Sequence, residues 1–226
     1  MRVASKAHFS AAGVRMDVLR NLAFTLGKGE TGALIGPSGC GKTSLMRLIA
    51  GIDRKFEGEI HRPAGAKLGM VFQEPRLLPW RSVEDNVRLA APAAGAAELA
   101  NLFAALGLAA HRTLFPGELS LGLARRVAIA RAFAVEPDLL LLDEPFVSLD
   151  EALARKLQDE LASLVAARRV TTLLVTHDIE EALRLANRIF LLSARPAHIV
   201  QEIYVNASTD AAGLRRQIAH SLAAVS

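Results

Sequence analysis

The chain has 226 residues, and its 27 basic and 23 acidic side chains leave a net charge of +4, too small a balance to indicate a polyanion-binding face. Hydrophobic residues make up 51% and charged residues 22%, which excludes a disordered chain. Aromatic residues reach only 5% and there is one cysteine, which argues against a base-stacking platform and excludes an internal disulfide or a cysteine-rich zinc site. No signal-peptide pattern or run of about 18 apolar residues occurs, so we expect a soluble, intracellular protein that does not bind nucleic acid.

The first third of the chain is predicted to consist of short strands and one helix. Turn residues at 27–29 and the stop signal of Gly51 separate these segments. The predicted strands run over 2–9, 22–26, 31–35 and 67–72, and the predicted helix runs over 42–49.

The remainder alternates between helix and strand patterns. Ser82, followed by acidic residues, is typical of a helix N-cap, and three helical stretches are expected between 82 and 136, one of them over 125–135. Strand patterns return over 139–142, 172–175 and 188–192, separated by helices over 153–168 and 179–186. This alternation predicts a parallel sheet covered by helices on both faces, with a helical block inserted in an α/β domain. A last helix from Ala211 is expected to dock through Leu214, Ile218 and Leu222.

A phosphate-binding loop is predicted between the strand over 31–35 and the helix over 42–49, because the segment matches G-x-x-x-x-G-K-[ST]. Its glycines let successive N–H groups point at phosphate oxygens, and the helix adds the positive end of its dipole. Lys42 would reach the β- and γ-phosphates, and the Thr43 hydroxyl would bind Mg²⁺. Cys40 is interpreted as a small residue tolerated in the loop, where alkylation would block nucleotide. The loop residues are Gly36, Pro37, Ser38, Gly39, Cys40, Gly41, Lys42 and Thr43.

A second nucleotide element follows the four leucines over 139–142, which predict a strand buried on both faces. Asp143 at the carboxyl end of this strand is placed where Mg²⁺ lies in open α/β sheets. Glu144 comes next and can accept a proton from the water that attacks the γ-phosphate. The two elements together predict a nucleoside triphosphatase site for ATP and Mg²⁺.

With these motifs in order, the chain resembles the ATP-binding subunit of an ABC transporter over nearly its whole length. The resemblance implies a P-loop NTPase (RecA-like) fold: a single ATP-binding domain over 1–226 with an α-helical subdomain inserted at 82–136. It implies that Gln73 senses the γ-phosphate and the metal, so that Thr43, Gln73 and Asp143 would hold Mg²⁺.

Other motifs extend the resemblance to the rest of the nucleotide site. His177 resembles the switch histidine, and Asp150 in Ser-Leu-Asp resembles the aspartate of the D-loop. Ser120 and Gly122 stand in the place of the family signature, which implies that they cap ATP held by a second copy. Phe9 is the candidate for stacking on adenine.

The signature departs from the family pattern Leu-Ser-Gly-Gly-Gln at two positions. Leu121 replaces the first glycine and Leu123 replaces the glutamine. Because Ser120 and the helix amides remain, we expect a working but slower site in which Leu121 points away from phosphate; a degenerate site is the alternative. Arg125 and Arg126 are expected on a solvated face of the same helix rather than at phosphate, with a dimer interface as the alternative.

The partners follow from the resemblance. It implies a homodimer closed by two ATP molecules, peripheral on the cytoplasmic face of the cell membrane, that drives integral-membrane permease subunits and indirectly serves an extracytoplasmic solute-binding protein. The stretch over 73–80 resembles importers of nitrate, sulfonate, taurine and bicarbonate, and thiamine-precursor importers are similar. Leu77, Leu78 and Trp80 there predict either a docking groove or core packing.

Two other functions are alternatives to this importer. An ABC-type ATPase without a permease would act in DNA repair or on ribosomes, but such proteins carry a second cassette or long coiled coils. A P-loop kinase for a small acceptor would need an acceptor pocket and lid, and it would not explain Ser120, Asp150 and His177 in this order.

Overall fold

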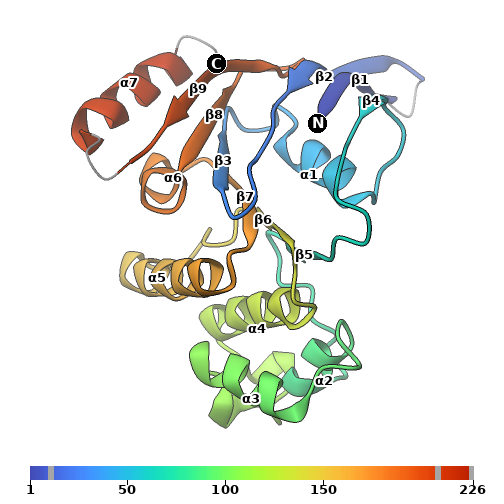
Figure 1. Ribbon diagram of the computed structural model, residues 1–226, viewed down its shortest axis with the longest axis vertical. Helices are drawn as coiled ribbons and strands as arrows, with labels where there is room; N and C mark the ends of the chain where they lie inside the picture. The colour runs from blue at the N-terminus through green and yellow to red at the C-terminus, as the bar shows by residue number, and fades with distance from the viewer. Residues whose placement is uncertain (10–12, 207–209, 224–226) are drawn as a thin grey trace. The chain divides into compact units, whose positions relative to one another are not determined.

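The computed structural model describes residues 1–9, 13–206 and 210–223, with Phe9 described by its backbone only. The chain forms two compact units. The first comprises Met1–Ala64 and Thr172–Ser226, and the second comprises Gly65–Thr171. Each unit contains parallel strands with helices (Figure 1), which confirms the predicted α/β class.

Four adjacent strands of a sheet form the centre of the first unit. These strands are β3 (Thr31–Ile35), β7 (Thr171–Thr176), β8 (Arg188–Leu192) and β9 (Ile199–Tyr204). They lie in the order β7-β3-β8-β9, with β3 parallel to both neighbours and β9 antiparallel to β8. All five residues of β3 are buried, as expected of a parallel strand covered on both faces.

A separate antiparallel sheet, which the sequence did not predict, also belongs to the first unit. It has the order β2-β1-β4, with β1 at Arg2–Phe9, β2 at Arg15–Ala23 and β4 at Glu57–Glu59. The predicted strand over 22–26 is wrong in its bounds, because pairing with β1 begins where Arg2 meets Ala23. Beyond that point Phe24 turns into the core, where its ring centroid lies 4.7 Å from that of Phe190.

The helices of the first unit agree with the predicted ones. They are α1 (Lys42–Ala50), α6 (Ile179–Leu185) and α7 (Ala211–Ala223). Helix α1 ends at Gly51, whose φ of 75° is left-handed and suits glycine. Helix α7 lies beside α6 (Figure 1) and buries Leu214 and Ile218, which confirms the expected docking of the last helix.

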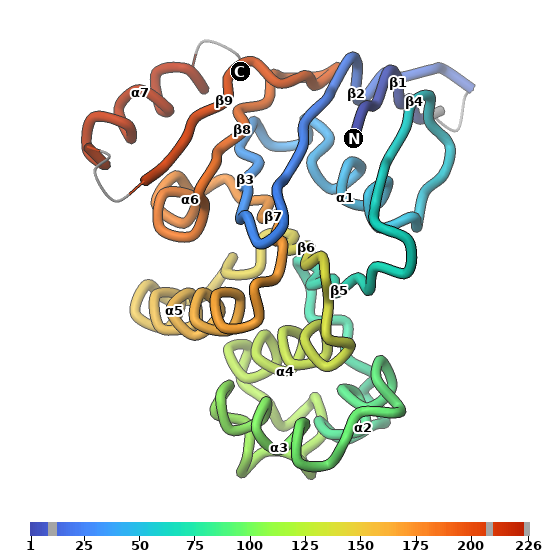
Figure 2. Tube along the Cα trace, viewed as in Figure 1, coloured from blue at the N-terminus to red at the C-terminus, as the bar shows by residue number. Residues whose placement is uncertain are grey.

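The second unit combines parallel strands with helices, whose course along the chain can be followed in Figure 2. The three helical stretches expected between 82 and 136 are present as α2, α3 and α4, and α4 lies against α2, α3 and β5. The elements are β5 (Leu68–Val71), α2 (Val83–Arg88), α3 (Ala96–Ala105), two short 3-10 turns (Ala109–His111 and Pro116–Glu118), α4 (Leu121–Ala134), β6 (Leu139–Asp143) and α5 (Glu151–Arg168).

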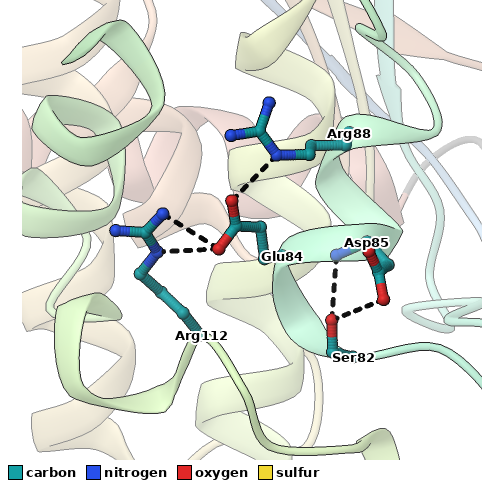
Figure 3. A network of polar contacts seen from close by, with 5 residues as sticks. All are labelled: Ser82, Glu84, Asp85, Arg88 and Arg112. Atoms are coloured by element: carbon teal, nitrogen blue, oxygen red, sulfur yellow. Dashed lines mark hydrogen bonds and ion pairs between the residues drawn. The ribbon is translucent and has the colours of Figure 1, made fainter. Parts of the chain in front are cut away.

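A polar network fixes the start of α2 (Figure 3). The Oγ atom of Ser82 accepts a hydrogen bond from the Asp85 amide, which confirms the predicted N-cap. Glu84 accepts from Nε of Arg88 at 2.8 Å and from Nε of Arg112 at 3.0 Å. The hydrogen bond from Arg88 is the main cause that holds the pKa of Glu84 below its usual value, and Arg112 acts in the same direction. The network thereby joins α2 to the loop that carries Arg112.

Among the described residues, no helix is both long and apolar enough to span a membrane.

Candidate functional site: the nucleotide-binding elements

The phosphate-binding loop connects β3 to α1 in the first unit, as predicted. Gly39 has φ 75° and Gly41 has φ 125°, which are conformations that residues with a Cβ rarely adopt. A methyl group on Gly41 would also lie 2.7 Å from Cγ1 of Val18. Both glycines therefore suit the tight path of the loop, and Gly41 also allows the close approach of Val18.

Lys42 already lies inside this loop. Its ammonium donates to the carbonyl oxygens of Gly36 at 2.7 Å and Pro37 at 2.9 Å, and its side chain is only 6% exposed. A buried charge needs such partners, and here they are backbone oxygens of the same loop. The cation is thus held inside the loop by the loop's own backbone.

Arg195 adds a second cation that the sequence analysis missed. A pocket of about 330 Å³ is lined by Pro37, Ser38, Gly39 and Cys40 on one side and by Ala194 and Arg195 on the other. A methyl group on Gly39 would lie 4.0 Å from Nη2 of Arg195. Arg195 is exposed, and its guanidinium has no hydrogen-bond or ion-pair partner within the described part of the chain. Only the neighbouring positions of β3 and β8 bring it here, so no sequence motif could have found it.

Cys40, the one thiol of the chain, is buried in the same loop at 2% exposure. Burial raises the pKa of the thiol, although the charge of Lys42 opposes the shift. Because only the thiolate reacts with alkylating agents, we expect slow labelling by iodoacetamide at neutral pH. The rate should rise about tenfold per pH unit between pH 7 and 9 without levelling off. Mass spectrometry of quenched samples measures this rate, and a plateau near pH 7 would contradict the prediction.

His177 leaves the sheet beside the loop. In the β3–β7 pair Ile35 is opposite Thr176, so Gly36 and His177 follow neighbouring strand ends at one edge of the sheet. The preceding Thr176 donates to Oε2 of Glu181 at 2.6 Å and accepts from the Asp178 amide at 3.0 Å. The His177 side chain is exposed. The buried Thr176–Glu181 hydrogen bond thus fixes the backbone next to the exposed His177.

Asp143 and Glu144 occupy the end of β6 in the second unit. Asp143 is 4% exposed and follows three buried leucines. Glu144 has φ 45°, and Ser148 a few residues later has φ 66°, both in the left-handed region that non-glycine residues rarely occupy. Such backbone strain is concentrated at functional sites in proteins, which fits a loop that presents Glu144 in a fixed direction.

Gln73 lies at the same edge as Glu144. Val71 is opposite Leu142 in the parallel β5–β6 pair, so Gln73 and Glu144 each lie two residues beyond paired positions. The Gln73 side chain is exposed, and its backbone carbonyl accepts from Arg125. The pairing register therefore brings these two candidate residues to adjacent strand ends.

Ser120 and Asp150 are both helix N-caps. Ser120 Oγ accepts from the Leu123 amide at 3.3 Å at the start of α4, and Asp150 accepts from the Leu153 amide at 2.9 Å at the start of α5. Leu121 is 43% exposed. A methyl group on Gly122 would lie 2.6 Å from Cδ2 of Leu153, so Gly122 allows the close approach of α4 and α5.

Three sequence expectations change or stay open. The expected solvated face for Arg125 and Arg126 is wrong, because the two side chains are 4% and 6% exposed; α4 is apolar nearly all round and buries them. Core packing is wrong for Trp80, which is 71% exposed. The side chain of Phe9, the adenine-stacking candidate, lies outside the described residues.

The predicted site residues form two groups, one in each unit. The phosphate-binding loop and His177 come together in the first unit. Gln73, Asp143 and Glu144 come together in the second, with Ser120 and Asp150 at the starts of its helices α4 and α5.

Known proteins with similar sequences are ATP-binding proteins of ABC transporters. A family model described as "ABC transporter" matches residues 19–147. An aliphatic sulfonates import ATP-binding protein (SsuB 2) of Burkholderia cenocepacia is 41% identical over 197 residues, covering 84% of this chain and 73% of the relative. The SsuB 1 protein of Pseudomonas aeruginosa is 44% identical over 204 residues, covering 83% and 81%.

Solved structures show the same fold. MJ0796, a bacterial ABC transporter cassette solved as a dimer, is 26% identical with a TM-score of 0.78, covering 91% of this chain and 99% of that one. Its dimeric post-hydrolysis state with ADP and Pi gives 25% identity, a TM-score of 0.76 and the same coverage. With the loop at Lys42, the acidic pair after β6 and this similarity over most of its length, the chain belongs to the ABC transporter family as an ATP-binding, ATP-hydrolysing cassette.

Proposed function

We propose that this chain powers the import of small sulfonate-like anions by closing as a homodimer around ATP beneath integral-membrane permease subunits. The observation that carries the proposal is the 41–44% identity to aliphatic sulfonate import proteins over more than four fifths of the chain. Membership of the ABC transporter family excludes the alternative of a P-loop small-molecule kinase. The solute-binding protein outside the membrane and the peripheral position on its cytoplasmic face are parts of the same proposal.

ATP binding begins in the first unit. The triphosphate would lie along the loop amides, with Lys42 exchanging the carbonyls of Gly36 and Pro37 for β- and γ-phosphate oxygens. Arg195 would contribute positive charge from the opposite wall of the pocket. Phe9 is proposed to stack on adenine.

The residues proposed to hold Mg²⁺ suit that ion. Thr43, Gln73 and Asp143 offer a hydroxyl, an amide and a carboxylate oxygen, which are the hard donors that Mg²⁺ prefers alongside phosphate. Asp143 is buried at the end of β6, where the carboxylate is held close to its strand. The ion would offset phosphate charge when bound.

The catalytic residues follow from their places in the two units. Glu144 would accept the proton of the attacking water, Gln73 would orient the γ-phosphate, and His177 would donate to it as charge develops. Asp150 and Ser120 with the α4 amides would complete the site of a second copy. Leu121 is 43% exposed, and the proposal requires its side chain to point away from those amides.

The domain organisation is also proposed: a single ATP-binding domain over 1–226, in which 82–136 is the helical subdomain. The permease would dock on the segment after Gln73, where Trp80 is 71% exposed. Tryptophan is enriched among the residues that contribute most of the binding energy at protein interfaces.

Arg195→Ala is expected to raise KM for ATP about two- to fivefold at low salt and to leave kcat unchanged, because a partly exposed cation contributes about 0.2–1 kcal/mol to binding. The difference should shrink as salt is added. Steady-state hydrolysis measures both constants, with the exposed Arg216→Ala as the matched control. An unchanged KM for Arg195→Ala at low salt would exclude Arg195 from the phosphate site.

Growth on a sulfonate tests the whole proposal. A Pseudomonas aeruginosa strain lacking its aliphatic sulfonates import ATP-binding protein should regain growth on an aliphatic sulfonate as sole sulfur source when it expresses this chain. Glu144→Gln should not restore growth. A chain that hydrolyses ATP and co-purifies with the permease, yet restores no growth, would contradict the sulfonate assignment and leave the ATPase assignment intact.

A further inference from the structure

Arg125 contacts both loops that carry candidate catalytic residues in the second unit. From its position on α4, the guanidinium donates to the carbonyl oxygens of Phe72 at 3.4 Å, of Gln73, and of Val147 at 3.2 Å. The first two acceptors belong to the loop after β5. The third belongs to the loop after β6, so one side chain joins the two loops.

Each element that Arg125 joins carries a residue proposed to act on ATP. Gln73 is itself an acceptor. Val147 lies between Glu144 and Asp150, and its amide donates to the Glu144 carbonyl at 3.4 Å. Helix α4 begins one residue after its cap, Ser120, little more than one turn before Arg125. Through its side chain and its place on α4, Arg125 thus connects three segments that carry residues proposed to act on ATP.

The burial of Arg125 is costly and is not balanced by an acid. The residue is 4% exposed, its Nε is buried without a hydrogen-bond partner, and among the described residues no carboxylate forms an ion pair with it. Burial also lowers the pKa of its guanidinium, with the charge of Glu74 acting in the opposite direction. A buried cation held only by carbonyls adds little to stability compared with an apolar side chain of the same size. We therefore infer that the main effect of Arg125 is to hold the two loops that it contacts.

Arg126, the next residue, shows what a structural arginine does on the same helix. Its guanidinium forms an ion pair with Glu160 of α5 and donates to the Leu106 carbonyl at 3.0 Å. It is equally buried, at 6% exposure. Neither contact reaches a loop with a candidate catalytic residue, so Arg126 is a matched control for Arg125.

We propose that Arg125 is a positioning residue for ATP hydrolysis: it holds the Gln73 loop and the loop over 144–150 in register with the helix that Ser120 caps. The proposal rests on the function proposed above for Gln73, Glu144 and Ser120. It predicts that ATP still binds when the guanidinium is lost, because the phosphate-binding loop is in the other unit. The chemical step then slows because Gln73 and Glu144 no longer keep their alignment.

Arg125→Met and Arg126→Met separate positioning from packing. For Arg125→Met we expect KM for MgATP within twofold of wild type and kcat lower by about 10- to 100-fold, since a misplacement of about 1 Å can have that effect. For Arg126→Met we expect a similar or larger fall in melting temperature with kcat within twofold of wild type. Hydrolysis is measured well below either melting temperature.

Arg125→Lys is a second test of the proposal, and it remains available if the methionine variant is insoluble. Lysine keeps the charge but lacks the planar fork that reaches three carbonyls, so kcat should fall at least fivefold, whereas Arg126→Lys should not change it. Equal losses of kcat in the two lysine variants, or full kcat in Arg125→Lys, would overturn the proposal. An inactive wild-type chain would instead overturn the proposed function itself.

Discussion

Replacing Glu144 with glutamine is expected to lower kcat by about 10²–10⁴-fold, the usual contribution of a general base, while ATP binding is retained. Glutamine keeps the size and the hydrogen-bonding oxygen of the side chain but cannot accept the proton of the attacking water. The left-handed backbone at residue 144, with φ 45°, is as strained in the variant as in the wild type. A loss of rate therefore reports chemistry rather than a changed loop.

Glu136→Gln is the matched control. Glu136 belongs to the same unit, has a comparable left-handed φ of 52°, and pairs with Lys67 in an exposed contact. Its substitution should change neither kcat nor KM. Equal losses of rate in Glu136→Gln and Glu144→Gln would show that the loss does not come from the carboxylate of Glu144.

The Glu144→Gln variant should also accumulate as an ATP-bound dimer. Without hydrolysis the closed state cannot reopen by that route, so MgATP should shift the protein from monomer to dimer in size-exclusion chromatography. Adding Ser120→Arg should abolish the shift, because a bulky cation would replace the cap at the start of α4. A variant that binds ATP but stays monomeric would indicate that Leu121 and Leu123 have impaired the composite site, or that assembly requires the permease.

The helices and parallel strands of the fold were predictable because the spacing of their apolar residues indicates both the type of element and its buried face. The four leucines before Asp143 and the phosphate-binding loop each fix their element locally. Strand β4 was missed because its three residues, Glu-Gly-Glu, are all exposed and show no alternation. Its pairing with β1 spans more than fifty residues, which no local pattern records.

The candidate site was predictable where motifs mark it and not where tertiary contacts build it. Lys42 and Glu144 lie in local signatures, whereas Arg195 reaches the loop only through the pairing of β3 with β8. Arg125 was assigned to solvent because charged residues usually are exposed. The mostly apolar stretch over 127–134 of the same helix was the sequence signal that Arg125 would be buried.

Lys42→Met is expected to weaken ATP binding by about 10- to 150-fold. The estimate is the loss of about 1.5–3 kcal/mol for hydrogen bonds to a charged group. Stability should change little. Of the two carbonyls that Lys42 now contacts, that of Pro37 also accepts from the Cys40 amide at 3.2 Å. Titration of a fluorescent ATP analogue measures the affinity, and binding within threefold of wild type would contradict the assigned role.

Lys42→Arg tests whether charge alone is sufficient, and we expect it not to restore affinity. The ammonium occupies a nearly closed space, 6% exposed, between carbonyls at 2.7 and 2.9 Å. A planar guanidinium is larger and needs its own fixed set of acceptors, so it would displace the loop that it should complete. ADP should lose less affinity than ATP in both Lys42 variants, because part of the contact is with the γ-phosphate. Equal losses for the two nucleotides would place Lys42 away from that phosphate.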